Sequence, residues 1–193
     1  MRPVRSAAVF CGARLGNKPE YRDAAEALGR GLARAGIKLV YGGGRVGLMG
    51  AVADGALAEG GAVVGVIPTF LADREVAHPA VAEMIVTGNM HSRKQRMFEL
   101  ADAFIMMPGG LGTLDEIVEI MTWRQLGLHH KPVLLCNVMG AAKPLLDAIA
   151  AAVEMGFADA EARGIVEVAD DVPALLRRLT QTEAADAGMP TRL

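Results

Sequence analysis

Apolar runs of strand length recur along this chain, and helical patterns separate them. The seven runs lie at residues 7–11, 37–41, 62–67, 83–87, 103–107, 133–138 and 165–168. Most are continuously apolar, which is typical of strands buried on both faces, as in a parallel sheet. Helical patterns fall at 19–35, 47–60, 92–101, 113–127, 143–155 and 172–180. This alternation predicts a Rossmann-like α/β three-layer sandwich with a mostly parallel sheet of about seven strands.

The length of 193 residues suits one domain with a substantial core. We therefore expect a single Rossmann-like domain over residues 1–180, with ligands at the carboxyl ends of its strands. Residues 71–79 are polar and contain a proline, and they are predicted to form a loop near the active face. Residues 181–193 lose apolar periodicity, so we expect them to form a flexible C-terminal tail.

The composition excludes several classes of protein. Hydrophobic residues make up 52%, charged residues 22%, and the net charge is -2, so no basic excess points to a nucleic-acid partner. No apolar segment approaches membrane-spanning length, and no signal peptide is evident at the N-terminus. Two cysteines make no disulfide framework, and the His129–His130 pair has no metal-ligand spacing. We therefore expect a cytoplasmic protein that binds neither a metal nor a membrane.

Residues 106–116 read MMPGGLGTLDE and join a predicted strand to a predicted helix. Gly109, Gly110 and Gly112 lack side chains, so backbone amides of this loop can approach a ligand closely. The helix that follows offers unpaired N–H groups and the positive end of its dipole, which favour a phosphate or another anion. Glu116 then lies about one turn into the helix. Because a carboxylate repels an anion, Glu116 needs a neutral or developing positive centre to act on.

A simpler interpretation of the same helix start stays open. Thr113 and Glu116 have the spacing of a capping box, in which the Thr hydroxyl and the Glu carboxylate bond to backbone N–H groups at the helix N-terminus. Capping alone would explain these two residues. The three preceding glycines favour a ligand site.

A second glycine cluster, GGGRVG at residues 42–47, matches the dinucleotide-binding pattern G-x-G-x-x-G. Its context argues against that function. The cluster follows the second predicted strand, and the strand after it (62–67) has no acidic residue at its end to bind a ribose hydroxyl. A tight strand-to-helix turn, or a backbone that approaches a ligand, explains the glycines equally well.

The third cluster reads MHSRKQ at residues 90–95. Ser92 and Gln95 have capping-box spacing, which would place Arg93 and Lys94 in the first turn of a helix. Cations at that position oppose the helix dipole, so they indicate an anionic ligand or a carboxylate nearby. A solvated pair of positive side chains remains the alternative.

Together these motifs resemble the LONELY GUY (LOG) family of cytokinin-activating phosphoribohydrolases, whose older members were labelled "lysine decarboxylase-like". The resemblance runs from about residue 6 to residue 179. It rests on the PGGxGTxxE and MHxRK motifs, on GGGRVGLMG, and on the opening segment VFCGARLG. The family typically has Ser where this chain has Ala13, which would remove one hydroxyl contact to the ligand.

The resemblance implies hydrolysis of the N-glycosidic bond of a nucleoside 5'-monophosphate, without a cofactor. Arg93 and Glu116 would be the catalytic pair. The substrate-binding residues would be Glu75, Lys94, Gly109, Gly110, Leu111, Gly112, Thr113, Leu114, Asp115 and Thr122. Such cleavage passes through a ribosyl cation, which would give Glu116 a positive centre to stabilise while the glycine loop holds the phosphate.

Two further points stay open. The same fold could serve a noncatalytic nucleotide or nucleotide-cofactor carrier, and the sequence does not distinguish isopentenyladenine from adenine as the base. None of the five lysines lies in a recognisable pyridoxal-phosphate motif, so the decarboxylase label gains no support. The helix after the glycine loop continues with Ile120, Met121, Trp123, Leu126 and Leu128. Apolar residues around so much of its circumference predict a homodimer or a larger assembly, with the active sites near the interface.

Overall fold

The computed structural model describes residues 2–75 and 77–184, with the backbone alone for residues 2, 73–75 and 183–184. Seven strands form one parallel sheet in the order β5-β4-β3-β2-β6-β7-β8. They are β2 (Ser6–Phe10), β3 (Lys38–Tyr41), β4 (Val63–Pro68), β5 (Glu83–Thr87), β6 (Ala103–Met106), β7 (Val133–Cys136) and β8 (Glu167–Ala169). This sheet confirms the predicted Rossmann-like α/β fold.

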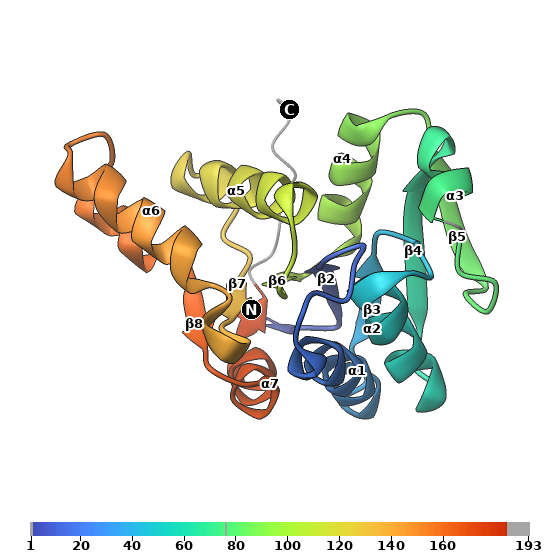
Figure 1. Cartoon of the computed structure of the whole chain (residues 1–193). Coiled ribbons are helices and arrows are strands. Elements are labelled where there is room, and N and C mark those ends of the chain that lie inside the picture. Colours follow the sequence, from blue (N-terminus) through green and yellow to red (C-terminus); the bar gives the residue numbers. More distant parts are fainter. Residues whose placement is uncertain (1, 76, 185–193) are drawn as a thin grey trace.

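Helices cover both faces of the sheet (Figure 1). One layer contains α1 (Pro19–Arg34), α2 (Gly47–Ala58) and α7 (Val172–Gln181), and the other contains α4 (Met90–Leu100), α5 (Leu111–Gln125) and α6 (Lys143–Glu154). Because side chains alternate along a strand, Val9 and Cys11 of the β2 region enter the first core cluster, while Ala8 and Phe10 enter the second. Burial on both faces explains the continuous apolar runs.

Short elements appear where the sequence shows no clear periodicity. The prediction of a loop at 71–79 is wrong for residues 71–75, because these residues belong to helix α3 (Thr69–Glu75). Seven residues are too few for an apolar stripe to be evident in the sequence. Two 3-10 turns, η1 (Val138–Gly140) and η2 (Ala160–Gly164), were not predicted either.

The two ends of the described chain lie together. Strand β1 (Arg2–Pro3) pairs antiparallel with β9 (Glu183–Ala184). The predicted tail at 181–193 therefore begins with the end of α7 and a paired strand, whereas residues 185–193 lie outside the described part of the chain.

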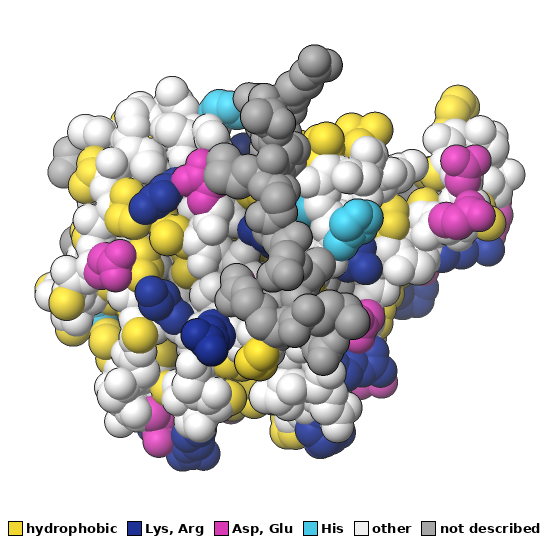
Figure 2. All heavy atoms as spheres, turned by 180° about the vertical axis from the view of Figure 1, so that it is seen from behind, with side chains coloured by type: hydrophobic (Ala, Val, Ile, Leu, Met, Phe, Trp, Pro, Cys, Tyr) yellow, Lys and Arg dark blue, Asp and Glu magenta, His cyan; other side chains and the backbone are white. Residues whose placement is uncertain are grey.

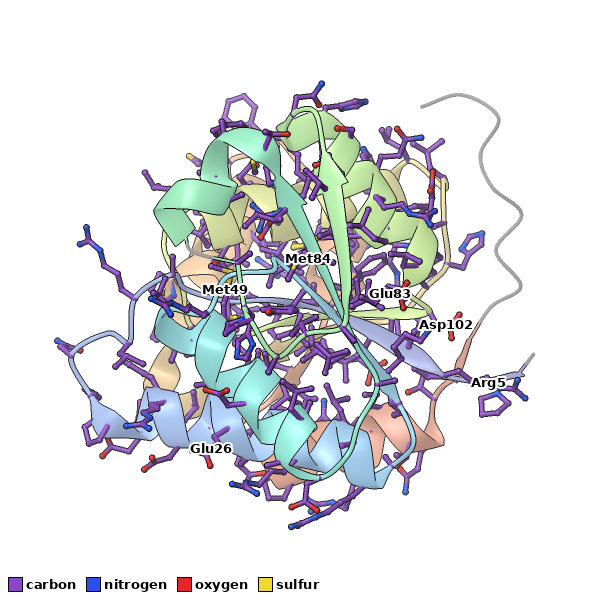
Figure 3. The ribbon with its side chains drawn as sticks, turned by 90° about the vertical axis from the view of Figure 1, so that its right-hand side faces the viewer. Arg5, Glu26, Met49, Glu83, Met84 and Asp102 are labelled. Carbon is purple, nitrogen blue, oxygen red and sulfur yellow. The ribbon has the colours of Figure 1, made fainter. Side chains whose placement is uncertain are left out.

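A buried carboxylate joins the starts of the two central strands. Asp102, just before β6, accepts hydrogen bonds from the backbone N–H groups of Arg5 (2.9 Å) and Ser6 (3.2 Å) (Figure 3). Its own N–H donates to the carbonyl of Ser6 at 3.0 Å. Strands β2 and β6 are the neighbours at which the strand order reverses, so the loops at their carboxyl ends diverge and open a crevice for ligands.

The surface has mixed charge. Figure 2 shows one face on which the described basic and acidic side chains are interspersed with hydrophobic ones. None of the helices in the described part of the chain is long and apolar enough to cross a membrane.

Candidate active site

A cavity of about 690 Å³ opens at the carboxyl ends of β2 and β6, where the reversal of strand order predicts a ligand site. Its lining comes from the loop after β2, the starts of α2 and α4, helix α3, the loop after β6 and the first turns of α5. The volume suits one small ligand. The long apolar side chains Leu48, Met49, Leu71 and Met90 in this lining come from α2, α3 and α4, whereas the glycine loop lines the side next to α5.

The loop from Pro108 to Gly110 connects β6 to α5, as the sequence predicts. The N–H group of Gly12 donates to the carbonyl of Pro108 at 3.0 Å and ties this loop to the one after β2. Gly110, Gly112 and Thr113 line the cavity at the N-terminus of α5. The first N–H groups of a helix have no partners within it, and its dipole adds positive charge there, so this side of the cavity suits an anion.

The alternative interpretation of Thr113 and Glu116 as a capping box is wrong. Helix α5 begins at Leu111, two residues earlier than predicted, and its N-cap is Gly110 without a side-chain hydrogen bond. Thr113 is therefore the third residue of the helix. Glu116 lies in the second turn, too far along to reach back to the N-cap. Glycine is tolerated at an N-cap, which is why the first hydroxyl residue did not mark the boundary.

Arg93 and Glu116 meet at the cavity wall. The Nη2 atom of Arg93 lies 3.7 Å from Oε1 of Glu116, and the two residues are only 5% and 7% exposed. Nη2 also donates to the carbonyl of Gly42 at 3.4 Å, and Nη1 lies 3.7 Å from the sulfur of Met90. Nε of Arg93 has no hydrogen-bond partner among the described residues. A buried donor of this kind is costly unless a ligand or water uses it.

Gly42 makes room for this guanidinium. A Cβ atom at residue 42 would lie 2.1 Å from Nη2 of Arg93 and 2.8 Å from the sulfur of Met49. Any side chain there would displace Arg93 from Glu116. The first glycine of the GGGRVG cluster thus serves the candidate catalytic pair.

The rest of that cluster does not form an open anion site. The N–H groups of Leu48 and Met49, in the first turn of α2, both donate to the carbonyl of Gly12, at 2.9 and 3.3 Å. A protein carbonyl therefore occupies the position that a pyrophosphate takes in a dinucleotide-binding fold. This agrees with the sequence argument against a dinucleotide.

Helix α4 starts earlier than predicted, and the capping box assigned to Ser92 and Gln95 is wrong. Asn89 is the N-cap, and its Oδ1 accepts from the N–H of Ser92 at 2.8 Å, while Oγ of Ser92 accepts from the N–H of Asn89 at 3.2 Å. Both residues are good cap formers, and the sequence alone favoured the later one. Arg93 and Lys94 consequently lie in the second turn, where the helix dipole opposes them less.

Lys94 joins α4 to α5. Its Nζ atom lies 3.2 Å from Oδ2 of Asp115 and 3.1 Å from Oε2 of Glu119. Partial burial by itself would lower the pKa of Lys94, but these two carboxylates outweigh it and raise that pKa above its usual value. The carboxylate partner expected for this cation is therefore present, and Lys94 is not among the residues that line the cavity.

The structure brings together six of the predicted site residues around the cavity: Arg93, Gly109, Gly110, Gly112, Thr113 and Glu116. Others lie apart from it. Leu111 is 85% exposed, Leu114 and Asp115 do not line the cavity, and the hydroxyl of Thr122 donates to the carbonyl of Val118 at 2.8 Å. Glu75 ends α3, and its side chain lies outside the described part of the structure.

Several lining residues were not predicted from the sequence. They include Arg14, Leu48, Met49, Leu71 and Met90, which come from four separate segments. Apolar residues at the starts of helices look like ordinary core residues in a sequence. Only the meeting of these segments at one edge of the sheet makes them a site.

The fold and the cavity define a Rossmann-like protein with a cavity of small-molecule size, in which a helix start suited to an anion lies beside a buried cation–carboxylate pair. A family model described as "Possible lysine decarboxylase" matches residues 49–179. The probable cytokinin riboside 5'-monophosphate phosphoribohydrolase LOG4 of Oryza sativa subsp. japonica is 48% identical over 182 residues, covering 94% of this chain and 79% of that protein. This chain belongs to that family, the LOG family.

A bacterial relative is equally similar. The cytokinin riboside 5'-monophosphate phosphoribohydrolase of Rhodococcoides fascians is 48% identical over 169 residues, covering 87% of this chain and 85% of that protein. Among solved structures, the molybdenum cofactor carrier protein of Chlamydomonas reinhardtii matches with a TM-score of 0.70 and 24% identity, covering 94% of this chain and 98% of that one. The similarity to the carrier protein shows a shared fold alone.

Proposed function

We propose that this protein is a phosphoribohydrolase that cleaves the N-glycosidic bond of cytokinin riboside 5'-monophosphates, of AMP, or of both. The products are the free base and ribose 5-phosphate. The family supports this activity, since similar members carry that name. The observation that carries it in this chain is the buried Arg93–Glu116 pair, which lines the same cavity as the N-terminus of α5.

The 5'-phosphate would bind at the glycine loop. Gly110, Gly112 and Thr113 line that side of the cavity, and the unpaired N–H groups of the first turn of α5 can donate to phosphate oxygens. Binding there would present the ribose to Glu116, one and a half turns further along the same helix. The phosphate and the reacting carbon of one substrate thus meet groups of opposite charge.

Glu116 would act on the anomeric carbon. As the bond between C1' and the base nitrogen breaks, the base leaves with the bonding electrons and positive charge develops on the ribosyl ring. The carboxylate stabilises this charge and accepts a proton from the water that adds to C1'. That proton then passes to the departing base, which restores the ionised carboxylate. Arg93 orients the carboxylate and favours its ionised form through the opposite charge.

The base would occupy the apolar side of the cavity. Leu48, Met49, Leu71 and Met90 line it, and the sulfur of Met90 lies 3.7 Å from Nη1 of Arg93. Methionine side chains adapt to irregular apolar surfaces and contact aromatic rings favourably. These residues suit a purine ring with or without an apolar N6 substituent.

Lysine-dependent decarboxylation has no support in the cavity. No lysine is among the described residues that line it. Lys94 is paired with Asp115 and Glu119, and Lys131 is buried with its Nζ donating to the carbonyl of Phe98 at 2.7 Å. A lysine that forms a Schiff base has to reach its ligand.

We also propose a homodimer, cytoplasmic as the composition suggests, with α5 at or near the interface. Of the apolar residues that first suggested this, Ile120 and Met121 are buried within the subunit, and Leu126 and Leu128 lie beyond the end of α5. Leu111, Leu114 and Val118 are instead exposed, and their spacing places them along one side of α5. An exposed apolar stripe of this kind favours association, and a twofold dimer is its commonest form.

Chromatographic assay of the reaction products tests the proposed activity. Purified protein incubated with AMP, or with isopentenyladenosine 5'-monophosphate, should release free base and ribose 5-phosphate, and the ratio of the two rates gives the base preference. A carrier protein would return both nucleotides unchanged.

A further inference from the structure

A second arginine lies at the cavity, on the loop after β2. Arg14 is exposed and lines the cavity together with the glycine loop. Among the described side chains, no carboxylate lies within ion-pair distance of Arg14. The surface arginines Arg30 and Arg34 of α1, by contrast, both pair with Glu59, at 3.3 and 2.7 Å. The positive charge of Arg14 is therefore available to a ligand.

The backbone of Arg14 is held in place. Gly47, whose φ is +64°, lies directly against it, because a Cβ atom at Gly47 would be 2.4 Å from the backbone nitrogen of Arg14. On the other side, Gly12 donates to the carbonyl of Pro108 and accepts from the N–H of Leu48. The loop is thus fixed between the start of α2 and the glycine loop (Figure 1). The side chain of Arg14 extends from a defined position beside the start of α5.

The charges that line the cavity leave a net positive excess. The described ionisable residues in its lining include Arg14, Arg93 and Glu116, and the last two neutralise each other. A phosphate monoester carries about 1.5 to 2 negative charges at neutral pH. The start of a helix supplies only about half a positive charge. A phosphate bound at α5 therefore needs another cation, and Arg14 is the lining residue free to supply it.

We propose that Arg14 binds the 5'-phosphate of the substrate and increases the affinity of the cavity for nucleotides over nucleosides. This inference rests on the proposed function, because it assigns a role within the same cavity. The guanidinium presents a planar set of donors that fits phosphate oxygens. When Arg14 is removed, the start of α5 still holds the phosphate and positions the ribose, so the loss of Arg14 raises KM and leaves kcat nearly unchanged.

The test compares Arg14→Ala with the wild-type protein and with Arg22→Ala, which removes an exposed arginine outside the cavity lining. Arg14→Ala should raise KM for the nucleotide about tenfold, the loss expected for one partly exposed charge-assisted contact, and keep kcat within about twofold. Arg14→Lys should recover part of the affinity, because it restores the charge without the planar donors. Arg22→Ala should match the wild type.

Direct titration with ribose 5-phosphate separates this inference from the proposed activity, since it needs no turnover. Its Kd should rise about tenfold in Arg14→Ala, in parallel with KM. If the wild type binds ribose 5-phosphate through Arg14 but cleaves no nucleotide, the proposed function fails and the role of Arg14 stands. Equal Kd values for Arg14→Ala and Arg22→Ala would overturn the role of Arg14, and so would a wild type that does not bind ribose 5-phosphate.

Discussion

Arg93 and Glu116 face each other from α4 and α5 with 3.7 Å between Nη2 and Oε1, and both are almost fully buried. Removing two charges from water is expensive, and an ion pair at this distance recovers only part of that cost. Such a pair is weak evidence for stability. Its position in the wall of a ligand cavity is better explained by chemistry on the ligand.

Glu116→Gln should lower kcat at least about a hundredfold, a barrier increase of about 2.7 kcal/mol, because the amide carries no charge to stabilise the ribosyl cation. The variant keeps the size of the side chain, and Glu116 is not a helix cap, so the fold should be retained. Steady-state kinetics and thermal unfolding measure the two effects. The matched control is Glu154→Gln, an exposed glutamate on α6 that should leave kcat unchanged.

The partner residue completes this experiment. Arg93→Ala should reduce kcat to a similar extent. If the two residues act as a unit, the double variant should cost less than the sum of the single losses. Near wild-type turnover in Glu116→Gln would leave this carboxylate without a catalytic role.

Lys94 should affect catalysis by holding α4 against α5, and it should not contact the substrate. Lys94 follows Arg93 in the sequence, and its partner Asp115 precedes Glu116. Lys94→Ala removes the ion pair between these two neighbours of the catalytic pair. Looser positioning of the pair should lower kcat several-fold, while Kd for ribose 5-phosphate stays within about twofold. Lys143→Ala, which breaks an exposed pair with Asp147 within α6, is the control. A large rise in Kd with unchanged kcat would instead make Lys94 a substrate-binding residue.

The sequence predicted the layered fold because its signal is local: continuous apolar runs mark strands buried on both faces. It also pointed to Arg93, Glu116 and the glycine loop, all of which line the cavity. Helix starts were less certain, since several neighbouring residues can cap the same helix, as Asn89 and Ser92 show.

The apolar side of the site could not be predicted. Leu71 and Met90 gain their meaning only from contacts between segments distant in the chain. Lys94 illustrates the opposite case. Its motif position suggested substrate contact, and the fold directs its ammonium group to carboxylates of the neighbouring helix.

Acid should destabilise the protein through His129. This residue is buried, its Nε2 bonds to the carbonyl of Ile120 at 2.9 Å, and its Nδ1 accepts from the N–H of Lys131 at 3.1 Å. Burial lowers the pKa of His129 to about 4. Between pH 6.5 and 4 the unfolded chain therefore binds more protons than the folded one, so stability falls as the pH falls, by roughly 3 kcal/mol over the whole range.

Urea unfolding at pH 7, 5.5 and 4.5 measures this loss. His129→Gln should be less stable at pH 7 and should lose less stability on acidification. His130→Gln changes an exposed neighbour and should follow the wild type. Parallel pH profiles for all three proteins would exclude His129 as the source of acid sensitivity.

The proposed dimer predicts a mass of about 40 kDa by light scattering, twice the 20.2 kDa of the chain. Replacing Val118 by Asp places a charge at the C-terminal end of the exposed stripe on α5 and should shift the protein toward the monomer. Leu126→Asp, at an exposed position beyond the stripe, tests whether the effect is local. A wild type of about 20 kDa at micromolar concentration, with full activity, would contradict the proposal.

The most direct test of the central claim compares a nucleoside 5'-monophosphate with the corresponding nucleoside, with released base measured by chromatography. Phosphate binding at the start of α5 positions the ribose against Glu116, so the nucleoside should lose turnover as well as affinity. The prediction is rapid release of adenine or isopentenyladenine from the nucleotide and scarcely any from the nucleoside at saturating concentration. Equal turnover of the two substrates would contradict it.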